Sequence, residues 1–325
     1  MSNTVVPWTK KLDEPEMLPT RNGFGEGLVE AGKDRNVVAL CADLTESIRI
    51  EAFAKAYPEQ FVEIGVAEQN MMGIAAGLAL SGKIPFVASY AVFNPGRNWD
   101  QLRVSVAYSQ ANVKVIGAHA GLSVGPDGAT HQALEDIAIT RVLPGLVVIA
   151  PTDIHEARKV VKAVVDYKGP VYIRFGRDKV PTITTADTPF VIGKANLFRA
   201  GKDITICANG AIVYEALKAA EMLAKKKISA EVLAVPTIKP LDETAILSSV
   251  KKTGGMVTAE EAQINGGLGS AIAELLGEKH PVPMERIGVK DTFGESGTAG
   301  ELMDRYGLRS TDIYEAALRV VARKS

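Results

Sequence analysis

The chain has 325 residues, of which 46% are hydrophobic and 23% are charged, and its net charge is −1. That balance is typical of a globular protein with a sizeable core, and the near-zero charge excludes a broad electrostatic field for nucleic acid or an anionic membrane. The two cysteines, Cys41 and Cys207, lie inside apolar runs, which excludes a disulfide framework and a zinc site. The sequence has no signal-peptide pattern and no apolar run long enough to span a bilayer, so we expect a cytoplasmic protein.

Short β-branched runs alternate with helical stretches over the first half of the chain. We expect strands at residues 36–43, 61–65, 84–90, 112–119, 146–151 and 170–176. We expect helices at about residues 21–32, 47–57, 67–81, 97–110, 131–141 and 152–167. Runs that are apolar throughout are typical of parallel strands buried on both faces, so this half predicts a doubly wound α/β domain.

A segment rich in Pro and Thr, residues 180–195, interrupts this alternation before a second series begins. There we expect strands at 203–210, 230–238 and 254–261, helices to about 226 and near 242–252, and further helices to the end. The predicted fold class is therefore α/β, with two doubly wound domains and mostly parallel sheets. We divide the chain into a leader (1–20), a first domain (21–185), a linker (186–200) and a second domain (201–325).

Polar side chains follow several of the predicted strands. In open α/β sheets, ligands bind beyond the carboxyl ends of the strands. The residues at these positions are Asp43, Glu68, Tyr90, His119 and Arg177. We therefore expect a ligand site at this edge of the first sheet.

The segment GVAEQNMMGIAAGLAL (65–80) is dense in Gly and Ala and begins a predicted helix with Glu68. On helical spacing Glu68 shares a face with Met71, Met72 and Ala75, so its carboxyl group is expected to point into an apolar contact. Such a carboxyl favours its protonated form or needs a strong hydrogen-bond partner. The alternative is a first-turn glutamate that complements the helix dipole in solvent.

A glycine-rich loop, AHAGLSVGPDGATHQALEDIA (118–138), contains two of the four histidines. Its residues His119, Asp127 and His131 could supply hydrogen-bond donors and proton carriers for a polyhydroxylated substrate. Alternatively, PDG is an ordinary turn and His131 only occupies the start of a helix.

Arginines and aromatic residues also lie near strand and helix ends. Arginine binds phosphate in a bidentate manner, although a single arginine is more often a surface ion-pair residue. The arginines in question are Arg21, Arg97, Arg174 and Arg177. Tyr90 and Phe93 follow a strand, where aromatic side chains either fill a core or stack on a planar ring. Phosphate-loop, HExxH, GxSxG and CxxC motifs are absent from the sequence.

Taken in order, several segments resemble the transketolase family, which includes deoxyxylulose-phosphate synthase and the β subunits of 2-oxoacid dehydrogenases. They are ADLTES, GVAEQN, SYAVF with DQLR, GPDGATHQALEDIA, RVLPG and IRFGR, followed by TAEEAQINGGLGSAIAE and DTFGESG in the second domain. The similarity runs from about Arg21 to the C-terminus. It implies the pyrimidine-binding domain of a thiamine diphosphate enzyme, followed by a transketolase C-terminal domain.

The resemblance also implies roles for individual residues. Glu68 would hydrogen-bond the aminopyrimidine ring of thiamine diphosphate and is a catalytic residue, as is His131 beside the reacting oxygens. Tyr90 and Phe93 would line the pyrimidine pocket, with Asp43 near the cofactor.

Other roles implied by the resemblance concern the substrate. Four residues would hold a sugar phosphate: Arg21, Ser47, His119 and Arg177. Asp127 would bind a substrate hydroxyl group through a hydrogen bond. Because the loop NPGRNWDQLR is one residue longer than in some family members, no role is transferred to Arg97 or Trp99.

The chain contains no GDG motif, which holds the diphosphate and Mg²⁺ in this family, and it lacks the histidines of the family's N-terminal domain. The resemblance therefore implies a partner, the N-terminal subunit of a split transketolase of the pentose phosphate pathway. We expect a separate chain rather than a fragment, because a leader from Met1 precedes the similarity. A homodimer of this chain within a heterotetramer would transfer a two-carbon ketol unit from a ketose phosphate to an aldose phosphate.

Three alternatives remain open from the sequence. One is the β subunit of a 2-oxoacid dehydrogenase, against which GPDGATHQ argues through its Asp and His. A second is a half of a deoxyxylulose-phosphate synthase-like enzyme. The third is a non-catalytic regulatory homologue, against which the retained Glu68, His119, Asp127 and His131 argue.

Overall fold

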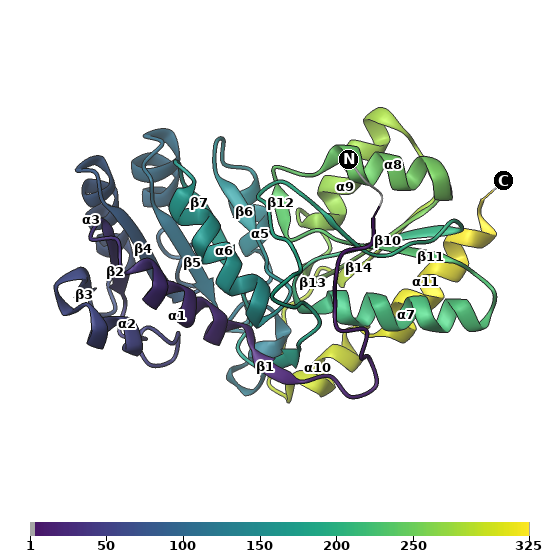
Figure 1. Ribbon diagram of the computed structural model, residues 1–325, viewed down its shortest axis with the longest axis horizontal. Coiled ribbons are helices and arrows are strands. Elements are labelled where there is room, and N and C mark those ends of the chain that lie inside the picture. Colours follow the sequence, from purple (N-terminus) through teal and green to yellow (C-terminus); the bar gives the residue numbers. More distant parts are fainter. Residues whose placement is uncertain (1–3, 325) are drawn as a thin grey trace.

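In the computed structural model, which describes residues 4–324, the chain forms two α/β domains that lie side by side (Figure 1). This arrangement confirms the predicted fold class. The first domain contains a seven-stranded sheet of order β12-β6-β7-β5-β4-β2-β3, in which all pairs except β12–β6 are parallel. Its strands are β2 (Val37–Cys41), β3 (Phe61–Glu63), β4 (Ile84–Tyr90), β5 (Lys114–Ala118), β6 (Val147–Ile149), β7 (Val171–Arg174) and β12 (Thr237–Lys239).

Helices cover both faces of this sheet because its central strands are buried throughout. One face packs on α1 (Thr20–Ala31), α2 (Glu51–Ala56) and α6 (Ile154–Asp166). The other face packs on α3 (Glu68–Leu80), the π-helix η2 (Leu102–Tyr108) and α5 (Asp136–Arg141). Short helical turns complete the domain: η1 (Pro58–Gln60), α4 (Trp99–Gln101) and η3 (Leu122–Asp127).

Three predicted helices are shorter than expected or are divided. The helix predicted at 47–57 begins only at Glu51, because Arg49 has a φ of 69° that is incompatible with a right-handed helix. The helix predicted at 131–141 begins only at Asp136, because the backbone of Ala133 pairs with that of Ala120 and accepts a hydrogen bond from the Gly121 amide at 2.8 Å. The helix predicted at 97–110 consists of α4 followed by η2.

The second domain has a five-stranded sheet of order β14-β13-β10-β11-β9. Its strands are β9 (Asn196–Arg199), β10 (Ile204–Ala208), β11 (Ala230–Ala234), β13 (Met256–Gln263) and β14 (Met284–Val289). The surrounding helices are η4 (Gly210–Ile212), α7 (Val213–Lys225), α8 (Glu243–Thr253), α9 (Leu268–Lys279), α10 (Ala299–Arg305) and α11 (Ser310–Ala322). Within residues 4–324, none of the helices combines the length and the apolar character that crossing a membrane requires.

The strand predicted at 230–238 is divided between the two sheets. Its first part, β11, pairs with β10 in the second domain. Pro236 has no N–H to donate to a sheet ladder, so the strand ends before it. The chain then crosses over, and β12 pairs antiparallel with β6 at the edge of the first sheet. The single predicted strand is therefore wrong, and the second half of the sequence completes the first domain.

The segments before and between the domains are more ordered than the sequence suggests. The antiparallel strand β9 forms inside the segment expected to be a linker, 186–200, so regular structure of the second sheet begins at Asn196. The leader residues 4–16 run along the second domain, where the Val6 amide donates to the Leu197 carbonyl at 2.9 Å (Figure 1). The leader ends in β1 (Met17–Pro19), which pairs with β8 (Lys179–Pro181).

The two domains share one apolar core and several polar contacts. The core cluster behind α3 continues into side chains of α8 and α9. Arg141 of the first domain forms two hydrogen bonds to Glu274 of the second, at 2.9 and 2.7 Å. Cys41 and Cys207 are both buried and unpaired, which confirms that they are core residues.

Candidate active site

The carboxyl edge of the first sheet gathers the predicted site residues. Tyr90 ends β4, while Asp43 and His119 follow β2 and β5. Arg177 follows β7, and Glu68 begins α3 just after β3. Parallel strands bring residues that are far apart in sequence to a single edge. This agrees with the rule that ligands of open α/β sheets bind beyond the carboxyl ends of the strands, called the strand-end rule below.

Glu68 is buried, with an exposed fraction of 1%. Its Oε2 accepts a hydrogen bond from Arg97 Nη1 at 2.7 Å, and the Asn98 amide holds the Glu68 carbonyl at 3.1 Å. No protein group of residues 4–324 donates to Glu68 Oε1. The interpretation of Glu68 as a solvent-facing helix-end residue is therefore wrong. We expected a buried carboxyl group either to favour its protonated form or to have a strong hydrogen-bond partner. The structure shows such a partner, the guanidinium group of Arg97.

Aromatic rings form a wall beside Glu68. The Tyr90 and Phe93 rings are nearly parallel, with centroids 6.3 Å apart, and the Arg97 guanidinium lies 4.6 Å from the Phe93 centroid. His131 meets the edge of Phe93 at 5.6 Å. These contacts make the wall a flat apolar surface with polar groups at its rim.

Ser47 lies at the centre of a polar chain on the other side of Tyr90. The Ser47 hydroxyl is 2.8 Å from the Tyr90 hydroxyl and 3.4 Å from His119 Nε2, while Arg21 Nη1 donates to the Ser47 carbonyl at 2.7 Å. The Tyr90 and His119 rings stack with centroids 3.9 Å apart. The structure thus brings together four residues that the sequence separates widely.

His119 is held as a neutral imidazole. Burial, and then the positive charges of Arg21 and Arg177 and the neighbouring His131, lower the pKa of His119 to about 3. Its Nδ1 is buried and has no hydrogen-bond partner among the described residues. At physiological pH His119 can therefore exchange hydrogen bonds with a ligand but does not add a charge.

The remaining predicted residues surround the same region. Arg177 Nη1 donates to Asp127 Oδ1 and to the Val124 carbonyl, each at 3.1 Å. Asp43 is exposed and lines a cavity of about 570 Å³ together with Arg21 and Ser47. All ten predicted site residues therefore lie at or around one edge of the sheet.

Two arginines depart from what the sequence suggested. Arg174, at the end of β7, donates to Asp136 at 2.8 Å in a buried pair shared with Tyr172, so it stabilises the interior. Arg97, to which no role was transferred, contacts Glu68 directly. Sequence spacing cannot show that the loop containing Arg97 folds back onto the start of α3.

Sequence reasoning did not single out Glu63. This carboxylate accepts hydrogen bonds from the amides of Asp43 and Gly65, at 2.8 and 2.9 Å, and from the Thr45 hydroxyl at 3.0 Å. It therefore joins the loop after β2, which lines the cavity, to the loop after β3. Its place at the end of β3 is a signal that the strand-end rule could have used.

Sequence models of two domains match the chain. The model of the transketolase pyrimidine-binding domain matches residues 16–182, and that of the transketolase C-terminal domain matches residues 193–313. The two matches correspond to the two α/β domains of the structure.

Known proteins similar to this chain agree with these matches. It is 45% identical to a 6-deoxy-6-sulfo-D-fructose transketolase subunit of Clostridium sp. (strain MSTE9), with 98% of each chain covered. It is 43% identical to an apulose-4-phosphate transketolase subunit of Phocaeicola vulgatus, over 94% of this chain and 99% of the relative. A solved structure described as a split gene transketolase, inactive β4 tetramer, covers 95% of this chain and 100% of its own, with a TM-score of 0.89 and 44% identity. The chain therefore belongs to the transketolase family and comprises the pyrimidine-binding and C-terminal domains of that family.

Proposed function

We propose that this chain is the C-terminal subunit of a split transketolase that depends on thiamine diphosphate. With an N-terminal subunit it would transfer a two-carbon ketol unit from a ketose phosphate to an aldose phosphate. Relatives of similar length are named as transketolase subunits, which supports the proposal that the enzyme is divided between two chains. The observation that carries the proposal is the buried Glu68 beside an aromatic wall, because one of its oxygens accepts no hydrogen bond from residues 4–324.

The site fits the aminopyrimidine end of the cofactor. Glu68 Oε1 is available to share a proton with a ring nitrogen, and Tyr90 and Phe93 offer flat faces to a heterocycle. When bound, thiamine diphosphate supplies the carbon nucleophile of the reaction. Asp43 lies near the cofactor in this proposal, and the N-terminal subunit holds the diphosphate and its Mg²⁺. Within residues 4–324, no group of three or more His, Cys, Asp or Glu side chains is arranged to bind a metal.

The polar chain around Ser47 fits the phosphate end of a sugar. In this proposal Arg21 and Arg177 neutralise the phosphate, while Ser47 and the neutral His119 exchange hydrogen bonds with it. Asp127, next to Arg177, accepts a hydrogen bond from a substrate hydroxyl group. His131, which lies against Phe93, carries a proton to or from the reacting oxygens.

A partner subunit would cover an apolar face of α3, the helix that begins with Glu68, and of the neighbouring η2. Leu80 on α3 and Tyr108 on η2 have exposed fractions of 70% and 86%. Side chains added at Gly73 and Gly77 of α3 would meet no other atom of the described chain within 4 Å, so another backbone could approach this helix closely. Large exposed apolar surface of this kind marks protein–protein contacts. We expect the N-terminal subunit to bind here in a heterotetramer that contains two copies of this chain.

Reconstitution tests the proposal. The purified chain would be assayed for ketol transfer alone and with a candidate N-terminal subunit, with and without thiamine diphosphate and Mg²⁺. We expect activity only for the mixture with both cofactors. Robust turnover by the lone chain would contradict the need for a partner. Decarboxylation of a 2-oxoacid with a lipoyl partner would instead identify a 2-oxoacid dehydrogenase subunit.

A further inference from the structure

We propose that Arg49 is a further specificity-determining residue, which acts with Arg21 to select substrates that end in a phosphate dianion. This inference rests on the proposed function and adds a residue that neither the strand-end rule nor the family resemblance assigned. Four observations support it: the position of Arg49, its backbone conformation, its weak ion pair and its effect on Arg21.

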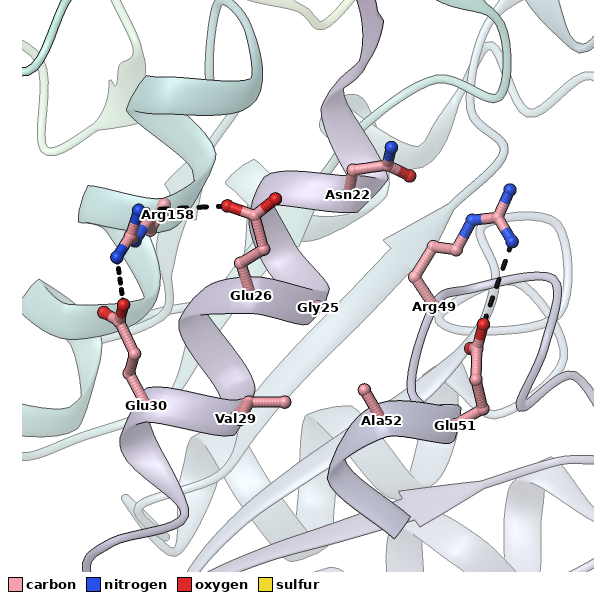
Figure 2. Close-up of a pocket in the computed structure, with 9 residues that line it drawn as sticks. All are labelled: Asn22, Gly25, Glu26, Val29, Glu30, Arg49, Glu51, Ala52 and Arg158. Carbon is pink, nitrogen blue, oxygen red and sulfur yellow. Dashed lines mark hydrogen bonds and ion pairs between the residues drawn. The ribbon is translucent and has the colours of Figure 1, made fainter. Parts of the chain in front are cut away.

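Arg49 lies beside the proposed phosphate site. It lines the same cavity of about 570 Å³ as Arg21, Ser47 and Asp43. It also lines the neighbouring groove between α1, α2 and α6, where Figure 2 shows its side chain extending from the loop before α2. Arg49 therefore stands at the boundary between the two depressions.

The backbone at Arg49 is unfavourable for its side chain. Its φ of 69° is in the left-handed region, which glycine adopts much more readily than arginine. The flanking residues Ile48 and Ile50 are fully buried and fix the loop. On α1, a Cβ at Gly25 would overlap the Arg49 carbonyl oxygen, so the helix leaves space for this conformation. An arginine at a backbone position that favours glycine indicates a role for its side chain.

Stability does not account for an arginine here. Among residues 4–324, its salt-bridge partner is Glu51, at 3.8 Å, and both side chains are well exposed. An exposed pair of this kind contributes little. In the same groove Arg158 is also exposed, but it forms a direct hydrogen bond to Glu30 and a longer ion pair to Glu26, so it is more closely paired than Arg49 (Figure 2).

Arg49 acts electrostatically on Arg21. The pKa of Arg21 is lowered by burial first, and then by the positive charges of Arg49 and Arg177. Arg21 Nε is buried without a hydrogen-bond partner in the described chain. An anion between Arg21 and Arg49 would relieve this repulsion.

Three guanidinium groups lie at or near the proposed phosphate site. Arg177 is partly neutralised by Asp127 at 3.1 Å, so Arg49 adds a guanidinium group to those of Arg21 and Arg177 at the proposed phosphate site. Asp43 and Glu46 also line the cavity, and their carboxylates offset part of this positive charge. A phosphate monoester carries a charge of about −1.5 to −2 at pH 7, whereas a sulfonate carries a single charge. Arg49 should therefore favour phosphate over sulfonate.

The test compares ligands that differ only in this terminal charge. The complex reconstituted with an N-terminal subunit would be titrated by calorimetry with a pentose 5-phosphate and with its sulfonate analogue. We expect Arg49→Gly to weaken phosphate binding about tenfold and sulfonate binding much less. Because glycine accepts a φ of 69°, the melting temperature should stay the same or rise. Arg49→Lys should retain most of the preference, and Glu51→Gln, which removes only the ion-pair partner, should leave it unchanged.

The outcomes separate this inference from the proposed function. If Arg21→Gln weakens phosphate binding but Arg49→Gly leaves the ratio of phosphate to sulfonate affinity unchanged, the role of Arg49 is overturned and the sugar-phosphate site stands. A lower melting temperature for both Arg49→Gly and Glu51→Gln, with unchanged affinity, would assign Arg49 a structural role. If neither arginine variant affects binding, both proposals fail.

Discussion

The two carboxylate oxygens of Glu68 differ in their hydrogen bonding. Arg97 donates to one oxygen and lies over Phe93, while the other oxygen accepts no hydrogen bond from residues 4–324. A buried carboxylate with a guanidinium partner is stabilised by charge and fixed in orientation. A group held in this way is suited to share a proton with a ligand, because it needs no rearrangement when the ligand arrives.

Glu68→Gln tests this role with little change in shape. Glutamine can still accept a hydrogen bond from Arg97 but cannot share a carboxyl proton. We expect ketol transfer by the reconstituted complex to fall by about 100-fold or more. Steady-state kinetics would measure the change, with the exposed Glu59→Gln as a matched control. Activity within about twofold of the unaltered complex would favour a non-catalytic homologue.

Glu156 predicts a pH dependence of stability. Burial raises the pKa of its carboxyl group from 4.5 to about 7, against the hydrogen bonds from Thr152 that lower it. A raised carboxyl pKa stabilises the folded chain fully below about pH 4.5 and loses that contribution as the pH rises towards 7. Glu156→Gln should therefore resemble the original chain at pH 5 and be more stable at pH 8, by about 2–3 kcal/mol.

Urea unfolding at several pH values would measure this difference, and the exposed Glu278→Gln would serve as the control. An equal effect of Glu156→Gln at pH 5 and pH 8 would show that the carboxyl does not change its protonation over this range.

At the scale of elements, α3 has two contrasting faces. Met71 and Met72 pack in the core behind the first sheet, whereas Gly73 and Gly77 face open space. Glycine within a helix costs stability relative to alanine by about 0.5–1 kcal/mol. Two exposed glycines in one helix are therefore better explained by close approach of another chain than by the stability of this one.

Gly77→Leu separates assembly from folding. A Cβ at Gly77 meets no atom of the described chain within 4 Å, so we expect the isolated protein to be at least as stable, but the close approach of a partner to α3 should be blocked. Analytical ultracentrifugation should then show loss of the complex. Gly277→Leu on α9, also an exposed helical glycine with open space around it, is the matched control and should leave assembly intact. Normal assembly of the Gly77→Leu variant would place the partner elsewhere.

At the scale of the whole molecule, the two domains depend on one another. The edge strand β12 of the first sheet comes from the second half of the chain, and one apolar cluster extends from α3 to α9. The Gln263 amide also donates to the Leu134 carbonyl across the boundary, at 2.8 Å. We therefore expect a single cooperative unfolding transition.

A chain that ends at residue 200 tests this dependence. It would leave the edge of β6 unpaired and expose the shared apolar cluster, so we expect it to aggregate or to remain unfolded. Circular dichroism and size-exclusion chromatography would show this. Co-expression with residues 201–325 should restore a soluble protein. A monomeric 1–200 fragment with a sharp thermal transition would show that the domains fold independently.

The sequence by itself determined the class of the fold and the edge of the sheet at which most of the candidate site residues lie. Apolar runs at regular intervals predicted parallel strands, and the strand-end rule placed Asp43, Tyr90, His119 and Arg177 at one edge, because both signals are local in the sequence. It also predicted that Glu68 is buried, from the apolar residues that share its helical face.

Only the tertiary structure decided which groups meet. The contact of Arg97 with Glu68, the division of 230–238 between two sheets and the left-handed Arg49 each depend on residues distant in sequence. Local propensity and periodicity contain no information on such long-range contacts, because the energy of a contact depends on how the whole chain packs. The arginines show this most clearly: Arg174 and Arg177 are three residues apart, yet one is in the core and the other lines the site.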